Sequence, residues 1–400
     1  MVTPYIYHVK HMFEMQEEIE KSRHGKMEKL GKYIQEYTVK NKCAESIPVY
    51  SVTNTQGFCK DYFGKEVASK DKTTYKIVPK GYFAYNPSRI NVGSVDWQRN
   101  EERVIVSPLY NVFSVSEQLN QQYLYYYLKS DIVRQFIKAI ARGTVRDNLK
   151  LSMLCEFPIY VPSVLEQENI VVKLDGLQKV INLRKQQLQK LDELIQARFV
   201  EMFGDPISNS LESNMLPMTD VCEIIDGDRG KNYPTQEEFN EKGYCLFLNA
   251  KNVTNVGFNF DKCMFITKQK DEILRKGKLC RGDVVLTTRG TIGNMAYYTE
   301  KIPFEHIRIN SGMVILRMKH EIINEVFFIE QFKMQIANIK SKIASGSAQP
   351  QLPISTMNRI HILIPDINSQ NQFADFVNQV NKSKLVIKNL LQIYKHQIQM

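Results

Sequence analysis

Two stretches of the chain carry apolar residues in steps of three and four, the spacing of a helix with one continuous apolar seam. The first follows Ser163 and Glu166, which have the spacing of a helix-capping box, and ends at Gly204. The pattern predicts long helices over 163–203 and 366–400, each about 55 to 60 Å long. The seams are Leu174, Leu177, Ile181, Leu188, Leu191 and Ile195 in the first helix, and Val377, Val380, Ile387, Leu391, Tyr394 and Ile398 in the second.

The two seams belong to a repeat. ARGTVRDNLKLSMLCEFPIYVPSVLEQENI, which begins at Ala141, aligns without a gap with ASGSAQPQLPISTMNRIHILIPDINSQNQF, which begins at Ala344. The same offset superposes the seams that follow, so the chain is a tandem duplication. Charged residues interrupt the seams at different places, Arg184 in the first and Lys384 in the second. We expect the two helices to pair; the alternative is that each packs only on its own domain.

Shorter apolar runs with strand-like composition precede each helix. VPKGYFAYNPSRINVG (78–93) is similar to LCRGDVVLTTRGTIG (279–293), and in both halves a strand and then a helix follow. The predicted strands cover Arg103–Ser107 and Ser311–Arg317, and the predicted helices cover Ser116–Ala141 and Asn324–Ile343. The predicted fold class is therefore α+β, with a pseudo-two-fold internal repeat of two tandem α+β domains, each followed by a long helix.

The domain boundaries follow from these elements. The predicted order is an N-terminal extension of unclear role (1–28), a first domain (29–162), a helix (163–203), a linker (204–217), a second domain (218–365) and a final helix (366–400).

The charge balance suggests a partner. The 400 residues include 53 Lys and Arg against 43 Asp and Glu, which gives a formal net charge of +10 and a pI near 9.0. A basic excess is typical of proteins that bind polyanions, most often nucleic acid. No apolar run is long enough to cross a membrane and the N-terminus lacks an apolar signal core. We therefore expect a cytoplasmic protein with no membrane partner.

Neither a metal site nor a catalytic constellation stands out. The seven cysteines lie far apart without a CxxC pair, and His8 and His11 lack a second pair of ligands. The sequence GKE at 64–66 has Glu where a phosphate-binding loop needs Ser or Thr. The sequence NPSR at 86–89 lacks the second proline and the aromatic ring of the amino-methyltransferase motif. We therefore predict no enzyme, metal or cofactor in this chain.

Several long motifs resemble one family, the DNA-specificity subunits of type I restriction–modification systems. The first-half motifs are YSVTNTQGF (50–58), VASKDKTTYKIVPKGYFAYNPSRINVG (67–93), GTVRDNLKLSMLCEFPIYVPSVLEQENI (143–170) and LDELIQARFVEMFGDP (191–206). The second-half motifs are RGDVVLTTRGTIGN and SGSAQPQLPISTMN. The resemblance covers about residues 29 to 400.

The resemblance implies two target-recognition domains, each reading one part of a split, asymmetric double-stranded DNA sequence. It also implies that the two helices are spacers packed as an antiparallel coiled coil, which fix the gap and dock two modification subunits. Those methyltransferase subunits use S-adenosylmethionine to methylate adenine, and restriction subunits that use ATP and Mg²⁺ join them. The specificity subunit itself is not catalytic.

Direct readout of DNA needs side chains that bind base edges or phosphates: Arg and Lys for guanine, Asn and Gln for adenine, and hydroxyl groups for either. Polar loops of both halves supply such side chains, although each is also compatible with an ordinary solvated loop. The first-domain candidates are Tyr85, Asn86, Ser88, Arg89, Asn91, Arg142, Thr144 and Arg146. The second-domain candidates are Lys251, Asn252, Thr287, Thr288, Arg289, Thr291, Asn294, Ser345, Ser347 and Gln349.

Two other functions remain open from the sequence. One is a non-catalytic recognition remnant of a fused methyltransferase–nuclease, and the other is a helical scaffold without sequence-specific DNA contact. Co-purified methyltransferase chains favour DNA recognition, and unrelated helical partners favour the scaffold. The run YLYYYL (123–128) is compatible with base stacking, but its helical spacing predicts aromatic core packing instead.

Overall fold

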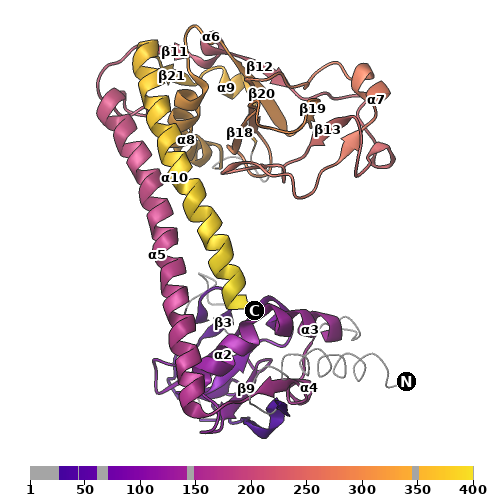
Figure 1. Ribbon diagram of the computed structural model, residues 1–400, viewed down its shortest axis with the longest axis vertical. Coiled ribbons are helices and arrows are strands. Elements are labelled where there is room, and N and C mark those ends of the chain that lie inside the picture. The colour runs from indigo at the N-terminus through magenta and orange to yellow at the C-terminus, as the bar shows by residue number, and fades with distance from the viewer. Residues whose placement is uncertain (1–26, 44, 61–70, 142–147, 345–350, 400) are drawn as a thin grey trace. The chain divides into compact units, whose positions relative to one another are not determined.

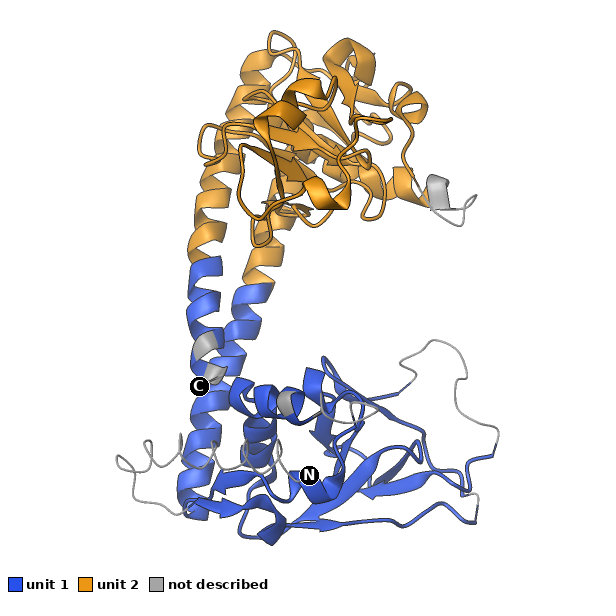
Figure 2. Ribbon diagram, turned by 90° about the vertical axis from the view of Figure 1, so that its right-hand side faces the viewer, with its two compact units in different colours: residues 1–185, 388–400 blue, residues 186–387 orange. Residues whose placement is uncertain are grey.

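The chain forms two compact units. The computed structural model describes residues 27–43, 45–60, 71–141, 148–344 and 351–399 (Figure 1). Unit 1 comprises residues 1–185 and 388–400, and unit 2 comprises residues 186–387 (Figure 2). Each unit contains an α+β domain and part of both long helices. The predicted fold class, two tandem α+β domains each followed by a long helix, is confirmed.

Unit 1 is built on a four-stranded antiparallel sheet in the order β2-β9-β6-β7. These strands are β2 (Ile34–Glu36), β9 (Asn111–Val115), β6 (Phe83–Tyr85) and β7 (Val95–Trp97). The other strands pair as β1 (Met27–Lys29) with β10 (Pro158–Tyr160), β3 (Ser51–Thr53) with β4 (Gly57–Cys59), and β5 (Lys76–Pro79) with β8 (Arg103–Val106). Phe83 and Tyr85 enter one core cluster while Ala84 enters another, because successive strand residues point to opposite faces.

Unit 2 repeats this sheet in the order β12-β20-β17-β18, again antiparallel. These strands are β12 (Cys222–Asp226), β20 (Met313–Met318), β17 (Val284–Thr287) and β18 (Met295–Tyr297). The other strands are β11 (Met215–Pro217) paired with β21 (His361–Leu363), β13 (Cys245–Leu248) between β16 (Phe265–Ile266) and β19 (Ile307–Ile309), and β14 (Val253–Thr254) paired with β15 (Gly257–Phe258). The duplication read in the sequence therefore extends to the sheet.

A short hairpin is also repeated, which the sequence analysis missed. VTNTQGF (52–58) contributes to β3 and β4, and VTNVGF (253–258) forms β14 and β15. In both hairpins a threonine hydroxyl donates to a glycine carbonyl oxygen, from Thr53 to Gly57 at 3.5 Å and from Thr254 to Gly257 at 2.9 Å. The repeat escaped notice because it lies outside the gapless register of the longer motifs.

The helix predicted to follow the strands of unit 1 is divided into two helices. Helices α2 (Gln121–Lys129) and α3 (Asp131–Ala141) replace the single helix predicted over Ser116–Ala141. Asn120, rather than Ser116, caps α2, because its side-chain oxygen accepts from two backbone N–H groups of the first turn. Ser130 separates the helices, since its backbone is extended.

In unit 2 a single helix lies at the position that α2 and α3 occupy in unit 1. The helix predicted over Asn324–Ile343 is observed as α8 (Glu325–Ala344), and Asn324 caps it as Asn120 caps α2. The shorter helices are α4 (Leu151–Leu154), α6 (Met218–Val221), α7 (Lys268–Ile273) and α9 (Ile354–Met357), with 3-10 turns η1 (Leu30–Lys32), η2 (Ile90–Val92) and η3 (Gln236–Glu238).

The tyrosine run of α2 packs in the core, as its helical spacing predicted. Leu124 and Leu128 are fully buried. The hydroxyl of Tyr123 donates to the carbonyl oxygen of Tyr160 at 2.7 Å, and that of Tyr127 donates to the carbonyl oxygen of Pro158. These hydroxyls therefore bind β10 and are not free to contact a base.

The two long helices are α5 (Val164–Phe203) and α10 (Ile367–Gln399). The hydroxyl of Ser163 accepts from the N–H of Glu166 at 3.3 Å, as the capping pattern predicted. The buried seam residues are Ile181, Ile195, Val377, Val380, Ile387 and Leu391, and the half-buried ones are Leu174, Leu177, Leu188, Leu191 and Tyr394. The side chain of Ile398 lies outside the described ones.

Within unit 2 the two long helices run antiparallel. Phe199 and Phe203 of α5 pack on Phe373 of α10, with ring centroids 5.4 and 5.8 Å apart. Earlier on α5, Asp192 accepts a hydrogen bond from Lys384, which lies later on α10. The charge that interrupts the second seam therefore has a partner on the facing helix.

Two short strands lie across predicted boundaries. β11 lies inside the predicted linker 204–217 and pairs with β21, and β1 begins at Met27, before the predicted start of the first domain. Strands of three residues are too short to show an alternation of apolar and polar positions, so the pattern does not predict them. Gly204 ends α5 with φ at 79°, a conformation that only glycine adopts readily.

A buried glutamine joins each long helix to its domain. Gln167 accepts from the N–H of Asn120 at 2.8 Å and donates to the carbonyl oxygens of Gln118 and Pro162. Gln370 accepts from the N–H of Asn324 at 2.9 Å and makes the corresponding donations to Ile322 and Pro365. Both side chains are completely buried.

Replacing Gln167 by alanine should destabilise unit 1 by about 2 to 4 kcal/mol, because one N–H group and two carbonyl oxygens lose their partner on a completely buried side chain. Urea unfolding, with hydrogen exchange of α2 as a local readout, measures the loss. Gln186→Ala, at an exposed position of the same helix, is the control and should change stability by less than about 0.5 kcal/mol. Equal stability of the two variants would contradict the assigned role.

Candidate nucleic-acid interface

The β6–β7 loop (86–94) presents polar side chains at one end of the unit 1 sheet. The side-chain oxygen of Asn86 accepts from the N–H of Ser88 at 3.1 Å, and the N–H of Arg89 donates to the carbonyl oxygen of Asn86 at 3.0 Å. The buried Ile90 anchors the turn that follows. This local bonding leaves Ser88 and Arg89 exposed while the loop backbone stays fixed.

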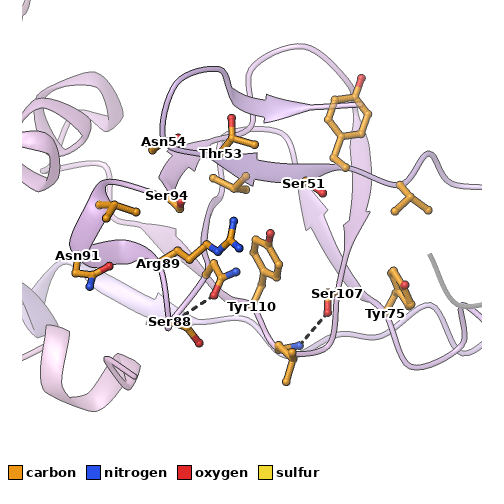
Figure 3. Close-up of a pocket in the computed structure, with 16 residues that line it drawn as sticks. Ser51, Thr53, Asn54, Tyr75, Ser88, Arg89, Asn91, Ser94, Ser107 and Tyr110 are labelled. Carbon is orange, nitrogen blue, oxygen red and sulfur yellow. Dashed lines mark hydrogen bonds between the residues drawn. The ribbon is translucent and has the colours of Figure 1, made fainter. Parts of the chain in front are cut away.

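A cleft of about 630 Å³ lies beside this loop. Four predicted residues line it: Asn86, Ser88, Arg89 and Asn91 (Figure 3). The cleft also contains polar residues that sequence reasoning missed, namely Ser51, Thr53, Asn54, Ser94, Ser107 and Tyr110. The polar run SVTNT was the available signal for three of these, but its hairpin reaches the loop only in the folded chain.

Tyr85 does not belong to this surface, which corrects the sequence-based expectation. Its side chain is completely buried, and its hydroxyl donates to the carbonyl oxygen of Leu149 at 3.0 Å and accepts from the Asn111 side chain at 2.8 Å. Burial raises the pKa of Tyr85, so the hydroxyl stays protonated as a donor. Tyr85 therefore supports the loop from the core.

The β17–β18 loop (288–294) occupies the equivalent place in unit 2. Arg289 and Thr291 are exposed. The carbonyl oxygen of Thr288 accepts from the N–H of Leu352 at 2.9 Å, and in unit 1 that of Pro87 accepts from Leu149 at 3.1 Å. Both loops are thus held by a leucine that occupies the same position in the two repeats.

A smaller cleft, about 230 Å³, lies beside the β17–β18 loop. Its polar lining residues are Asp226, Arg229, Thr288, Arg289 and Gln351. Among the described residues neither Arg89 nor Arg289 has an ion-pair partner, whereas Arg229 pairs with Asp226 at 3.1 Å. Each loop therefore offers one exposed guanidinium group for an anionic or base-edge partner.

Four other predicted residues of unit 2 hold the structure together, which corrects the expectation that they face a ligand. The hydroxyl of Thr287 donates to the carbonyl oxygen of Thr291 and accepts from the N–H of Asn294, and that of Thr288 donates to Gly312 at 3.0 Å. Thr287, Thr288 and Asn252 are buried.

The two asparagines of this set bind backbone groups. The amide nitrogen of Asn252 donates to the carbonyl oxygens of Asn259 and Lys262. That of Asn294 donates to the carbonyl oxygen of Val253 at 3.0 Å, which ties the β14–β15 hairpin to the loop. Residue type alone gave no sign of these structural roles.

The remaining candidates divide into one exposed residue and a set outside the described ranges. Lys251 is exposed beside the β14–β15 hairpin. Arg142, Thr144, Arg146, Ser345, Ser347 and Gln349 lie outside the described residues.

The described ranges contain no group of three or more His, Cys, Asp or Glu residues placed to hold a metal ion. No helix in those ranges is both long enough and apolar enough to cross a membrane.

Comparison with known proteins points to one family. Residues 17–193 and 212–393 both match the type I restriction modification DNA specificity domain. The chain is 24% identical over 336 residues to the type I restriction enzyme MjaIX specificity subunit of Methanocaldococcus jannaschii, across 80% of this chain and 74% of that relative.

One solved structure shares the fold, and a second is similar over most of the chain. One, from work on complex assembly and conformational transition of the type I R-M system, has a TM-score of 0.57 and 17% identity, and the match covers 94% of this chain and 96% of that one. The type I restriction-modification S subunit of M. genitalium gives a TM-score of 0.48 and 16% identity over 94% of this chain and 95% of that one.

Thr287, at the end of β17, and Thr291, in the β17–β18 loop, should respond differently to the same change. Thr287→Val removes a buried hydroxyl that bridges the loop, so we expect a loss of about 1 to 3 kcal/mol in the free energy of unfolding. Thr291→Val, at an exposed position, should change it by less than about 0.5 kcal/mol. Thermal unfolding measures both. A stable Thr287→Val variant would mean that the hydroxyl does not hold the loop.

Proposed function

The chain belongs to the type I restriction modification DNA specificity family, and on that premise we propose that each domain reads one part of a split double-stranded DNA target through its exposed loop. The first reading surface comprises the β6–β7 loop and its cleft. The second comprises the β17–β18 loop and its cleft. The chain is a DNA-recognition subunit and not an enzyme, and the catalytic steps belong to partner subunits.

The observation that carries this proposal is an exposed, unpaired arginine at the same place in both sheets. A guanidinium group can form two hydrogen bonds with guanine, or it can bind a phosphate. Neighbouring side-chain amides can bind adenine, and hydroxyl groups can bind guanine or adenine. Arg89 has Ser88, Asn86 and Asn91 beside it, whereas Arg289 has Thr291 and Gln351. Different neighbours on the same frame support an asymmetric target.

The long helices support docking of the partners. Apolar residues that the seams do not use stay exposed on them: Leu165, Val172, Leu183, Leu194, Leu385, Val386 and Ile393. Exposed apolar side chains in such number are typical of surfaces that bind other proteins. We propose that two modification subunits dock there and that restriction subunits join them.

The cofactors of the proposed complex belong to those partners. S-adenosylmethionine would bind the modification subunits, and ATP and Mg²⁺ the restriction subunits. We place the complex in the cytoplasm, where its DNA target lies. The family match favours this function over a remnant of a fused methyltransferase–nuclease or a helical scaffold.

Arg89→Ala and Arg289→Ala should each alter recognition of a different part of the target. Loss of one guanidinium contact to a base should weaken binding about 5- to 150-fold, equivalent to about 1 to 3 kcal/mol. Single-molecule sequencing of methylated adenines, in cells that carry the chain with its modification partner, identifies the affected positions. Arg103→Ala is a matched control, since Arg103 is exposed but paired with Glu45. Both variants altering the same positions would contradict two separate reading surfaces.

Binding of the assembled complex should weaken steeply with salt. If about 6 to 10 phosphates are neutralised, affinity should fall about 10³- to 10⁵-fold between about 50 and 200 mM salt. A salt titration of duplex binding measures the slope. An arginine that contacts phosphate should lower the slope by about one when replaced by alanine, while leaving the preferred sequence unchanged. A flat titration would contradict DNA binding through these loops.

A further inference from the structure

An apolar side chain stands exposed at the edge of the polar cleft in unit 1. Leu109, in the turn between β8 and β9, is 79% exposed. Among the described residues no other exposed leucine, isoleucine or valine reaches this fraction. A single exposed leucine is common on protein surfaces, so its meaning depends on how it is held and what lies beside it.

The turn that carries Leu109 is anchored on both sides. The N–H of Tyr110 donates to the carbonyl oxygen of Ser107 at 3.0 Å, and the N–H of Leu109 donates to the hydroxyl of Ser107 at 3.5 Å. Lys76 donates to the carbonyl oxygen of Tyr110 at 2.6 Å, and the Tyr110 ring packs in a core cluster. Pro108 fixes one further backbone angle. Leu109 is therefore exposed on a turn that hydrogen bonds hold on both sides.

Leu109 shares its cleft with the groups proposed to read bases. It lines the same cleft as Asn86, Ser88 and Arg89, and Figure 3 shows Ser88, Arg89, Ser107 and Tyr110 around this space. The edges of base pairs in the major groove are polar except at the C5-methyl group of thymine. An apolar side chain set among base-edge donors and acceptors is complementary to that methyl group.

We propose that Leu109 is a specificity-determining residue that recognises the C5-methyl group of a thymine in the part of the target read by the first domain. The inference rests on the proposed function, because it requires the cleft to face the major groove. The proposal assigns one base of the target, a thymine, to a surface whose other proposed contacts are polar.

The equivalent turn of unit 2 is polar. Between β19 and β20 the chain runs Asn310, Ser311 and Gly312, and the side chain of Asn310 accepts from the N–H of Gly312 at 2.9 Å. Arg229 donates to the carbonyl oxygen of Ser311 at 3.3 Å. Recognition of a methyl group at this turn is therefore confined to the first domain.

The test removes the methyl group and the leucine separately and together. The target is first identified by sequencing methylated adenines, and each thymine of the duplex is then replaced in turn by deoxyuridine. For the complex with modification subunits, one such replacement in the first part of the target should weaken binding about fourfold, the value for burying one methyl group at about 0.8 kcal/mol. With Leu109→Ala that penalty should disappear.

Val39→Ala is the matched control, because Val39 is an exposed apolar residue of the same unit that does not line the cleft. This variant should keep the wild-type response to deoxyuridine. A Leu109→Ala complex with the same deoxyuridine penalties as the wild type would overturn the proposal. Failure of the proposed function would look different, since the wild-type complex would then not distinguish its target from an unrelated duplex.

Discussion

The structure of each repeat depends on a buried glutamine amide whose hydrogen-bonding groups are all engaged. Gln167 and Gln370 bind the N–H of the asparagines that cap α2 and α8, respectively, and each also binds two carbonyl oxygens of adjacent loops. A shift of one residue in any of these segments would leave buried polar groups unpaired, at about 1 to 3 kcal/mol each. The start of the long helix is therefore fixed to the helix that covers the sheet. Because that helix packs on the sheet, the contact also links the long helix to the strands that carry the exposed loop.

Both domains share this frame of sheet, helices and buried polar contacts, but they carry different exposed residues on it. The sheet order, the capping asparagines, the Thr–Gly hairpins and the leucines that hold the loops all recur. The β6–β7 loop nevertheless displays Ser88 and Arg89, and the β17–β18 loop displays Arg289 and Thr291. Since exposed side chains contribute little to folding stability, one frame tolerates different sets of them. That is the physical basis of our proposal that a duplicated chain reads two unlike sequences.

Much of the frame could be predicted from the sequence, and less of the interface. The long helices could be predicted because an apolar seam that continues over many turns is a strong signal. The second copy of the repeat carries its seam at the same positions. The break at Ser130 was not readable, since the apolar spacing continues through it. Residue type suggested Arg89 and Arg289, but it also suggested Tyr85, Thr287 and Asn252, whose polar groups the core uses. Whether a polar side chain faces solvent depends on tertiary packing, which local sequence does not encode. For the same reason the sequence did not predict that Ser51, Thr53 and Leu109 line the cleft, because they reach it from separate strands and turns.

The β3–β4 hairpin, which forms part of the unit 1 cleft, is held by a buried carboxylate. Asp96 accepts from the N–H of Phe58 at 3.1 Å and from the N–H of Trp97 at 2.9 Å, and it pairs with Arg99 at 2.8 Å. It thereby ties the β3–β4 hairpin to the sheet. Gly57 is required at the contact, since a Cβ atom there would lie 1.9 Å from an Asp96 carboxylate oxygen. In unit 2 the amide of Asn294 ties the matching hairpin to its loop by a different bond. Base discrimination needs donors and acceptors held in position before DNA arrives, because ordering them on binding would weaken affinity. Both domains meet this need with buried polar contacts below the surface, so that the exposed side chains are free to differ.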